Sequence, residues 1–419
     1  MSSESFQPIQ GMSDIAEPEI PVWQHLESSA RAVLTLYGFS EVRTPVVERR
    51  SVFERSLGTT TDVVQKEMYQ FEDGGGRELV LRPEGTAGVI RYLAGLGQDG
   101  AAARVYYLGP MFRRERPQAG RKRQFHQFGA EAAGEPSPYA DAEMIALQVH
   151  LLQAWGLTNF IIKLNTRGMP ADRVAVQDGI RNLLEARRGE LCEDCQRRMD
   201  ANVLRVMDCK NPGCRAIVAE LPPMTSFMSE EARAYFEEVK RILERLDLQV
   251  TVDPNLVRGL DYYQHTVWEI AHPGLGAQDA VGAGGRYAIE LGGREVPGVG
   301  FAMGMERIIM ALEAEQKLPA PATQPLVWLV SVERSLLDAH LQLVQSLRLR
   351  GVKTRIDLGG RSIKAQMRAA AKAGARWVIL HGADEDAKGT FQLKDMESGE
   401  QREVDMPGLL EVVRPALVS

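Results

Sequence analysis

Apolar residues recur at helical spacing in two parts of the chain. Within residues 23–37 they follow one another mainly at steps of three and four, and Gly38 comes directly after them. This spacing places them on one face of a helix, which a glycine commonly terminates. A similar stripe occupies residues 235–246 and follows Ser229. We therefore expect two amphipathic helices that each pack one face against a core.

Other segments are rich in β-branched or alternating apolar residues and predict strands. In residues 41–47, Pro45 lacks a backbone donor and favours a sheet edge or an interface. Residues 77–82 predict a second strand that leads into a helix. Residues 105–112 and 124–131 predict an antiparallel hairpin around a long loop.

Glycine is concentrated in one later segment. Residues 274–304 contain ten glycines in 31 positions, against 39 in the 419 residues of the chain. Such an excess indicates backbone that packs closely against another strand or a ligand.

The texture of the sequence changes twice along the chain. Residues 166–246 are rich in charged helical segments and hold all four cysteines, which predicts an inserted helical domain. Three prolines within residues 319–325 predict a linker. From residue 326 onward, strand and helix patterns alternate and predict a small α/β domain with a mostly parallel sheet.

The composition is that of a soluble globular protein, with 44% hydrophobic and 25% charged residues and a formal charge of −6. The mild acidity excludes a uniformly basic nucleic-acid binder. It is an average, because residues 113–123 carry a net +5 and residues 348–376 carry a net +8. Such clusters can bind polyanions, although a solvated basic surface gives the same pattern.

Nothing in the sequence indicates secretion or membrane insertion. The first residues lack the basic and apolar regions of a secretory signal, and no apolar run approaches the roughly 18 residues of a membrane span. The four cysteines do not suggest a secreted disulfide scaffold. We therefore expect a cytoplasmic protein with no membrane partner.

Arginines are the candidate nucleotide ligands, because the chain has no G-x-x-x-x-G-K-[ST] loop and no strand followed by G-x-G-x-x-G. Guanidinium groups in the loop 113–123 suit a triphosphate. In the following strand Gln127, Gly129 and Glu131 share one face, and the glycine is expected to leave an open space between amide and carboxylate. Arg258, with two tyrosines shortly after it, predicts either a ligand pocket or a surface ion pair.

These segments together resemble the motifs of a known enzyme family. Residues 112–131 resemble motif 2 of class II aminoacyl-tRNA synthetases, residues 298–307 resemble motif 3, and the strand with Pro45 resembles motif 1. Residues 256–263 and 283–287 resemble two peptides that are peculiar to histidyl-tRNA synthetases. The resemblance covers nearly the whole chain.

The resemblance implies an α+β fold with an antiparallel-sheet catalytic domain formed by residues 1–165 and 247–318. A helical insertion, residues 166–246, would reach over the acceptor stem of tRNA. Residues 319–325 would lead to a C-terminal α/β anticodon-binding domain, residues 326–419. The family also implies a homodimer, with motif 1 at its interface.

The implied activity is ATP-dependent ligation of L-histidine to histidine tRNA through a histidyl-adenylate, with release of pyrophosphate and AMP. The alternative is a histidine-sensing, synthetase-like regulatory subunit of ATP phosphoribosyltransferase. That subunit typically lacks the anticodon-binding domain and parts of the signature peptides. Because this chain keeps both, the enzyme interpretation is favoured.

The resemblance also assigns site residues. Catalytic roles fall to Arg113 and Arg258, which would flank the histidine carboxylate and the α-phosphate. The outer phosphates of ATP would be held with the help of Mg²⁺. Histidine ligands would be Glu84, Gly85, Thr86, Gln127, Glu131, Tyr262 and Tyr263, and ATP ligands would be Arg113, Arg116, Arg121 and Arg307. Gln10 and Ala288 depart from the usual family pattern, which leaves the role of Arg286 open.

The cysteines form the pattern C-x2-C-x13-C-x4-C at Cys192, Cys195, Cys209 and Cys214. This spacing is compatible with a tetrahedral Zn²⁺ site that would be structural. Three reduced structural thiols and one bystander would give the same pattern, and the resembled family does not depend on a metal here. From the sequence, zinc is therefore possible but not expected, and no protein-bound catalytic metal is expected.

Overall fold

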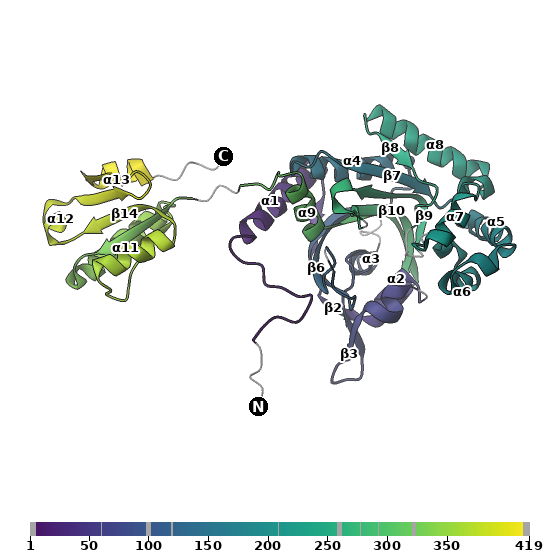
Figure 1. The fold of residues 1–419 in the computed structure, drawn as a ribbon, viewed down its shortest axis with the longest axis horizontal. Coiled ribbons are helices and arrows are strands. Elements are labelled where there is room, and N and C mark those ends of the chain that lie inside the picture. Colours follow the sequence, from purple (N-terminus) through teal and green to yellow (C-terminus); the bar gives the residue numbers. More distant parts are fainter. Residues whose placement is uncertain are drawn as a thin grey trace. The chain divides into compact units, whose positions relative to one another are not determined.

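The chain forms two compact units, residues Met1–Ala320 and Pro321–Ser419, and each is described by itself. Figure 1 shows the helices and strands of both units. The computed structural model describes residues 6–59, 61–97, 102–118, 120–207, 209–257, 262–276, 278–291, 293–320 and 324–413.

An eight-stranded sheet forms the centre of the first unit. Its five inner pairings are antiparallel, whereas β1 pairs with β5 and β7 with β8 in parallel. The expected antiparallel sheet is thereby confirmed. In spatial order the strands are β1 (Ser40–Glu41), β5 (Ala103–Phe112), β6 (Gln124–Ala133), β11 (Arg294–Gly304), β10 (Ala280–Leu291), β9 (Tyr263–Ala271), β7 (Ile161–Thr166) and β8 (Val250–Val252).

The predicted hairpin and the glycine-rich segment lie side by side in this sheet. Strands β5 and β6 pair from Ala103 with Ala133 to Phe112 with Gln124. Strands β10 and β11 contain most of the glycine-rich segment and occupy interior positions. A Cβ atom on Gly284 would lie 2.3 Å from the ring of Trp268. The glycines therefore permit close approach of large side chains to the backbone.

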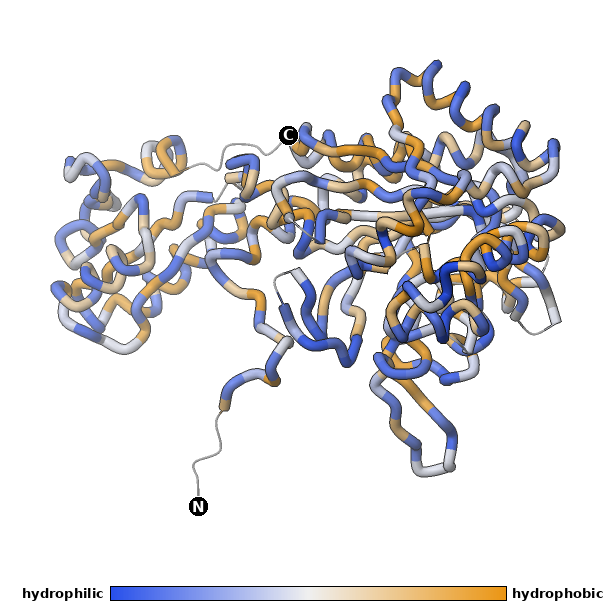
Figure 2. Tube along the Cα trace, turned by 45° about the vertical axis from the view of Figure 1, so that its right-hand side comes forward, coloured by the Kyte–Doolittle hydropathy of each residue, from blue (hydrophilic) through white to orange (hydrophobic). Residues whose placement is uncertain are grey.

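Helices cover the sheet and complete its hydrophobic core. Both predicted amphipathic helices are present, as α1 (Ile20–Leu36) and α8 (Glu230–Arg245). Hydrophilic and hydrophobic residues alternate along α8 in Figure 2. Its buried face, which includes Phe236 and Leu243, belongs to the same core as α4 (Pro138–Ala154) and α9 (Met305–Ala314).

The strand predicted for residues 41–47 is wrong in its extent. Only Ser40–Glu41 pairs with the large sheet, and β2 (Val47–Arg49) belongs to a separate three-stranded sheet with β4 (Glu78–Leu81) and β3 (Tyr69–Glu72). Pro45 lies between the two strands, and it cannot donate a backbone hydrogen bond to either sheet. Helices α2 (Arg50–Leu57) and α3 (Thr86–Gly95) and the π-helical turn Val63–Glu67 complete this region.

Three short helices gather around a separate small core within the insertion. They are α5 (Arg173–Glu185), α6 (Glu193–Ala201) and α7 (Pro212–Ala219). Asp172 joins the two ends of this part, because its carboxylate accepts the backbone N–H of Met169 and that of Ser229, each at 2.8 Å. Short 3-10 turns lie at Pro170–Asp172, Arg188–Glu190, Val203–Val206, Met224–Phe227 and Pro273–Leu275.

The second unit contains a five-stranded sheet in the order β13-β12-β14-β15-β16. The first three strands are parallel, but β14, β15 and β16 pair antiparallel, so the prediction of a mostly parallel sheet holds only for the first half. No helix in the described residues has the length and apolarity needed to cross a membrane. The elements are β12 (Leu326–Ser331), α10 (Leu337–Leu349), β13 (Thr354–Ile356), α11 (Ile363–Lys372), β14 (Ala375–His381), α12 (Ala383–Lys388), β15 (Phe391–Asp395), β16 (Gln401–Val404) and α13 (Met406–Val413), with a 3-10 turn at Arg334–Leu336.

Candidate active site

A cavity lies over strands β6, β10 and β11, next to the start of α3. Seven of the residues predicted to bind histidine or catalyse the reaction line it: Glu84, Thr86, Arg113, Gln127, Glu131, Tyr262 and Tyr263. Residues 258–261 lie outside the described residues, so the predicted catalytic Arg258 is not placed. Polar groups from distant parts of the sequence thus converge in one cavity, as expected of a binding site.

Glu131 is the buried acidic group of this cavity. Its side chain accepts hydrogen bonds from the hydroxyl groups of Thr86 at 2.7 Å and Tyr287 at 2.9 Å. Burial raises the pKa of the Glu131 carboxyl to about 8. A Cβ atom at Gly300 would lie 1.7 Å from the carboxylate, so only glycine leaves room for it. The site therefore holds a carboxyl group that can change its protonation near neutral pH.

Glu84 is fixed at the N-terminus of α3. Its two carboxylate oxygens accept the backbone N–H groups of Thr86 and Ala87, both at 2.8 Å. Burial nevertheless raises the pKa of Glu84. Gly85, between Glu84 and Thr86, packs against Tyr107, whose ring would lie 2.1 Å from a Cβ atom added to the glycine. The peptide at 84–86 is thus held rigidly beside the cavity.

Gln127 and Gly129 on β6 have different surroundings. The buried Oε1 atom of Gln127 has no hydrogen-bond partner among the described residues, so it can accept one from a ligand. The open space predicted at Gly129 is wrong, because the ring of Tyr107 fills it and would lie 2.4 Å from an added Cβ atom. A bulky side chain at 129 would displace that ring.

Arg113 extends from the end of the hairpin to the cavity. Its Nε donates to the carbonyl oxygen of Pro83 at 2.9 Å, and its guanidinium lies 5.2 Å from the ring centroid of Phe125. Both contacts orient the planar group. Its Nη1 also lies 3.8 Å from a carboxylate oxygen of Glu115, a loose ion pair, and the guanidinium borders the cavity, where it can pair with an anion.

The other predicted ATP ligands lie along the loop and on α9. Arg116 is exposed, and Arg121 pairs with Glu115 at 3.2 Å. Arg307 donates from Nε to the carbonyl oxygen of Ala280 at 2.7 Å. Burial, together with the charge of Arg121, lowers the pKa of Arg307. Two cations that raise each other's energy in this way favour a polyanionic ligand.

The sequence interpretation missed Tyr287 and Gly300, which line the cavity, and Tyr107, which packs against Gly85 and Gly129 beside it. Tyr287 ends the peptide 283–287, which the motif comparison had singled out, but its contact with Glu131 crosses between strands. Gly300 lies opposite Glu131 in the register of β11 and β6. Strand order is needed to find such contacts, whereas the tyrosine itself could have been found from its motif.

Arg286, whose role the sequence left open, forms a buried ion pair with Asp141 of α4. The two side chains are 2.6 Å apart and at most 4% exposed. Thr266 and Tyr235 donate their hydroxyl groups to the same carboxylate at 2.5 and 3.0 Å. The network joins α4, β9, β10 and α8, so Arg286 stabilises the sheet beneath the site.

Replacing Asp141 by asparagine should destabilise the protein by about 3 to 5 kcal/mol, because it leaves the buried guanidinium without a counter-ion. Denaturant unfolding of the full chain measures this loss. Asp178→Asn removes an equal charge from an ion pair whose aspartate is 55% exposed and should cost less than about 1 kcal/mol. Equal losses in the two variants would contradict the role given to the buried pair.

The antiparallel sheet, the buried carboxyl cavity and the arginine-rich hairpin loop are those of a class II aminoacyl-tRNA synthetase. The family model described as histidyl-tRNA synthetase matches residues 11–308, and the anticodon binding domain model matches residues 326–415. This chain therefore belongs to the histidyl-tRNA synthetase family.

Individual relatives agree over the full length. The histidine–tRNA ligase of Halothermothrix orenii is 42% identical over 407 residues, which covers 96% of this chain and 97% of that protein. The ligase of Synechococcus sp. is 44% identical, with coverage of 95% and 96%. The crystal structure of apo histidyl-tRNA synthetase from S. aureus is 32% identical and superposes with a TM-score of 0.80, covering 98% of this chain and all of that one.

The fold alone does not separate the enzyme from the regulatory subunit. A structure from Bacillus halodurans described as an ATP phosphoribosyltransferase regulatory subunit/histidyl-tRNA synthetase has a TM-score of 0.65 at 21% identity, with coverage of 91% and 99%. The distinction rests on the curated ligases, which match the whole chain, and on the cavity residues.

Proposed function

We propose that this chain joins L-histidine to histidine tRNA in two steps, with ATP as the energy source. The observation that carries this proposal is the buried Glu131 carboxyl, which faces a cavity that Arg113 also lines. A site for histidine needs a group for the imidazole at one end and a cation for the carboxylate at the other. We assign adenylate formation to residues 1–165 and 247–318, contact with the acceptor stem to residues 166–246, and anticodon binding to residues 326–419, as proposed from the sequence.

Glu131 and Tyr263 recognise the imidazole ring. A neutral imidazole has one donor and one acceptor nitrogen, and a carboxylate with a phenol can pair with both. Gln127 supplies its free Oε1 to the α-amino group. Glu84 and Thr86 assist there. Tyr262 forms part of the pocket wall, and Gly85 supports the peptide 84–86 by packing against Tyr107.

Arg113 and Arg258 act on the first chemical step. They neutralise the histidine carboxylate and the α-phosphate as these two anions approach, and they stabilise the charge at phosphorus. The carboxylate is already a nucleophile, so the attack needs no general base. Arg116, Arg121 and Arg307 hold the outer phosphates and the departing pyrophosphate.

Mg²⁺ enters this site mainly with the nucleotide. Among the described residues, the four cysteines are the only group of three or more potential metal ligands that converge. Mg²⁺ prefers oxygen ligands, so the phosphate groups of the nucleotide would hold it in the site, and it would supply further charge neutralisation.

Histidine-dependent exchange of labelled pyrophosphate into ATP tests the proposal. The enzyme should catalyse exchange only with histidine present and should charge histidine tRNA. A protein whose binding sites are shown by titration to be intact, and which binds histidine but catalyses no exchange, would instead support the regulatory subunit. The two functions are thus separated by one assay.

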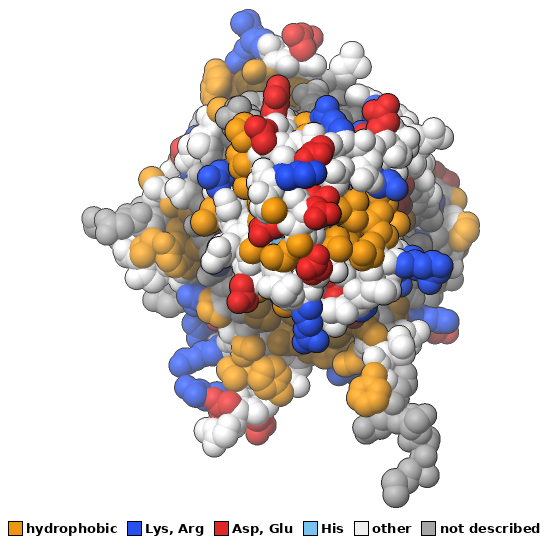
Figure 3. All heavy atoms as spheres, turned by 90° about the vertical axis from the view of Figure 1, so that its left-hand side faces the viewer, with side chains coloured by type: hydrophobic (Ala, Val, Ile, Leu, Met, Phe, Trp, Pro, Cys, Tyr) orange, Lys and Arg blue, Asp and Glu red, His pale blue; other side chains and the backbone are white. Residues whose placement is uncertain are grey.

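The C-terminal unit offers a basic surface to the tRNA anticodon stem. Lys364, Arg368 and Lys372 recur every four residues on α11, and all three are exposed. Elsewhere in the cluster, Arg376 is paired with Asp395 at 2.6 Å. Figure 3 accordingly shows basic and acidic side chains interspersed on the face that it presents. The stripe on α11, rather than the whole cluster, is the proposed RNA contact.

Reversing two charges of this stripe, in Lys364→Glu combined with Arg368→Glu, should raise the KM for tRNA by about tenfold or more at low salt. Pyrophosphate exchange should change by less than about twofold. Lys388→Glu, an exposed position on α12, serves as the control with little expected effect. A KM for tRNA that is unchanged in the double variant would remove α11 from the interface.

The working form is a cytoplasmic homodimer. The thiols of all four cysteines are free, which suits a reducing compartment. Val46 and Val47, next to Pro45 of motif 1, are 37% and 41% exposed, which suits burial in a dimer.

A further inference from the structure

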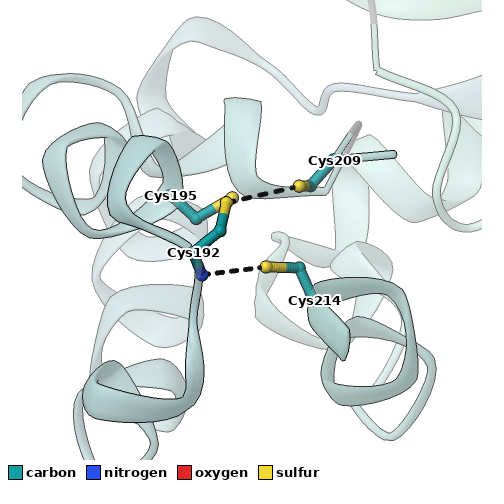
Figure 4. Close-up of side chains that lie close together, drawn as sticks. All are labelled: Cys192, Cys195, Cys209 and Cys214. Carbon is teal, nitrogen blue, oxygen red and sulfur yellow. Dashed lines mark hydrogen bonds between the residues drawn. The ribbon is translucent and has the colours of Figure 1, made fainter. Parts of the chain in front are cut away.

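The four cysteines of the insertion converge although they come from separate turns. Cys192 precedes α6, Cys195 lies in its first turn, Cys209 follows a 3-10 turn, and Cys214 lies in the first turn of α7. Their sulfur atoms all lie within 4.8 Å of one another. Figure 4 shows the side chains directed toward a common centre. None of them forms a disulfide.

We propose that Cys192, Cys195, Cys209 and Cys214 bind one Zn²⁺ ion that is structural. Zinc–sulfur bonds of about 2.3 Å in a tetrahedron place neighbouring sulfur atoms about 3.8 Å apart. The sulfur atoms of Cys192 and Cys209 are 3.9 Å apart. This separation is far from the roughly 2.05 Å of a disulfide bond and close to the edge of a zinc tetrahedron.

The surroundings suit thiolates. The backbone N–H of Cys192 donates to the sulfur of Cys214 at 3.2 Å. Such bonds orient ligands and stabilise their negative charge. Four thiolates and Zn²⁺ have a net charge of −2, and Arg198 and Lys210 line the same cavity of about 600 Å³ as two of the cysteines, whereas Arg205 there is paired with Asp62. Nearby cations can therefore balance the charge of the site.

Helices α6 and α7 bury few side chains, so a bound ion would add to their stability. Helix α6 has nine residues, of which only Cys195 and Met199 are buried. Helix α7 has eight residues, and Cys214 is one of its three buried residues. Helices this short are unstable alone, and a metal that joins them replaces a larger apolar core.

The ion would also set the position of the segment between the helices. Arg205 in this segment forms an ion pair with Asp62, which lies outside the insertion. The segment borders the same large cavity as Arg121 of the hairpin loop. The inference concerns metal binding and does not depend on the proposed reaction.

The test begins with the metal content of the full chain, purified without chelators from cells supplied with zinc. About one zinc per chain is expected, together with four titratable thiols after denaturation in chelator. Protein reconstituted with Co²⁺ should show the strong visible absorption of tetrahedral thiolate coordination. Less than about 0.2 zinc per chain, or loss of thiols to disulfides, would overturn the proposal.

A matched pair of variants separates metal binding from general packing. Cys209→Ala should lose most of the zinc and become at least about fivefold more sensitive to proteolysis between residues 186 and 229. Cys209→His keeps a zinc ligand, and the position borders a cavity with room for the ring. This variant should retain zinc and resist proteolysis. If both variants retain zinc equally, or both lose it without any change in proteolysis, the assigned site is wrong.

Discussion

Replacing Arg113 by alanine should lower the rate of histidine-dependent pyrophosphate exchange by about 10² to 10³-fold. Its guanidinium is oriented by Pro83 and Phe125 and lines the cavity that holds Glu131. The effect should fall mainly on the rate of adenylate formation, because the developing charge at phosphorus exists only in the transition state. Steady-state pyrophosphate exchange measures the overall loss, and single-turnover kinetics measure the rate of adenylate formation.

Arg113→Lys and Arg77→Ala complete this experiment. Lysine keeps the charge but lacks the planar fork, so exchange should remain at least about tenfold impaired. Arg77 lies between β3 and β4 and is 66% exposed. Arg77→Ala changes the net charge as much as Arg113→Ala does, but it should change the exchange rate by less than about twofold. Normal exchange in Arg113→Ala would exclude this residue from the chemical step.

Replacing Glu131 by glutamine should raise the KM for histidine by about 10² to 10³-fold while the KM for ATP changes little. Glutamine keeps the shape of the side chain but loses the negative charge that pairs with the imidazole N–H. A buried polar group without a suitable partner weakens binding strongly. Initial rates of exchange at varied histidine and ATP provide the measurement. Equal increases in both KM values would mean a general disturbance of the fold.

The pH dependence gives a second measurement on the same variant. With a Glu131 pKa of about 8 in the free protein, neutral pH leaves most of this group protonated. Histidine binding that requires the ionised form should therefore strengthen as pH rises from 7 to 8 and level off above 8. In Glu131→Gln this rise should be absent. A wild-type affinity that falls over this range would contradict the proposed pairing.

The free energy of unfolding of the ligand-free protein should fall as pH rises, whereas the affinity for histidine should increase. The folded-state pKa of Glu131 lies above its unfolded value, so the stability linked to this group is present below about pH 4.5 and is lost as pH rises through 8. The loss is on the order of 5 kcal/mol, because each pKa unit between the unfolded and folded values corresponds to about 1.4 kcal/mol. Ligand-free Glu131→Gln should therefore melt at a higher temperature than the wild type at pH 8.

The sequence was sufficient for those parts of the fold that depend on local pattern. The hairpin of β5 and β6 and the helices α1 and α8 follow from apolar periodicity, which directly reflects burial. The interrupted strand at Pro45 did not follow, because a run of β-branched residues does not show which sheet each half joins. The antiparallel β15 and β16 also depend on a topology that periodicity does not specify.

The candidate site was predicted through motifs rather than through physical pattern. Gln127 and Glu131 share a strand face, so their proximity follows from a period of two. Glu84 and Tyr287 reach the same cavity only through tertiary packing. The mistaken space at Gly129 has the same origin, since the ring that fills it belongs to the neighbouring strand.

The carboxylate of Asp172 limits how the inserted helices can move. It holds the chain entering this part at Met169 and the chain leaving it at Ser229. Beyond that point, Tyr235 of α8 is fixed to the sheet through Asp141. The chain entering the insertion and the chain leaving it are therefore tied to each other at one carboxylate, so neither can shift at this point without breaking a hydrogen bond of the other.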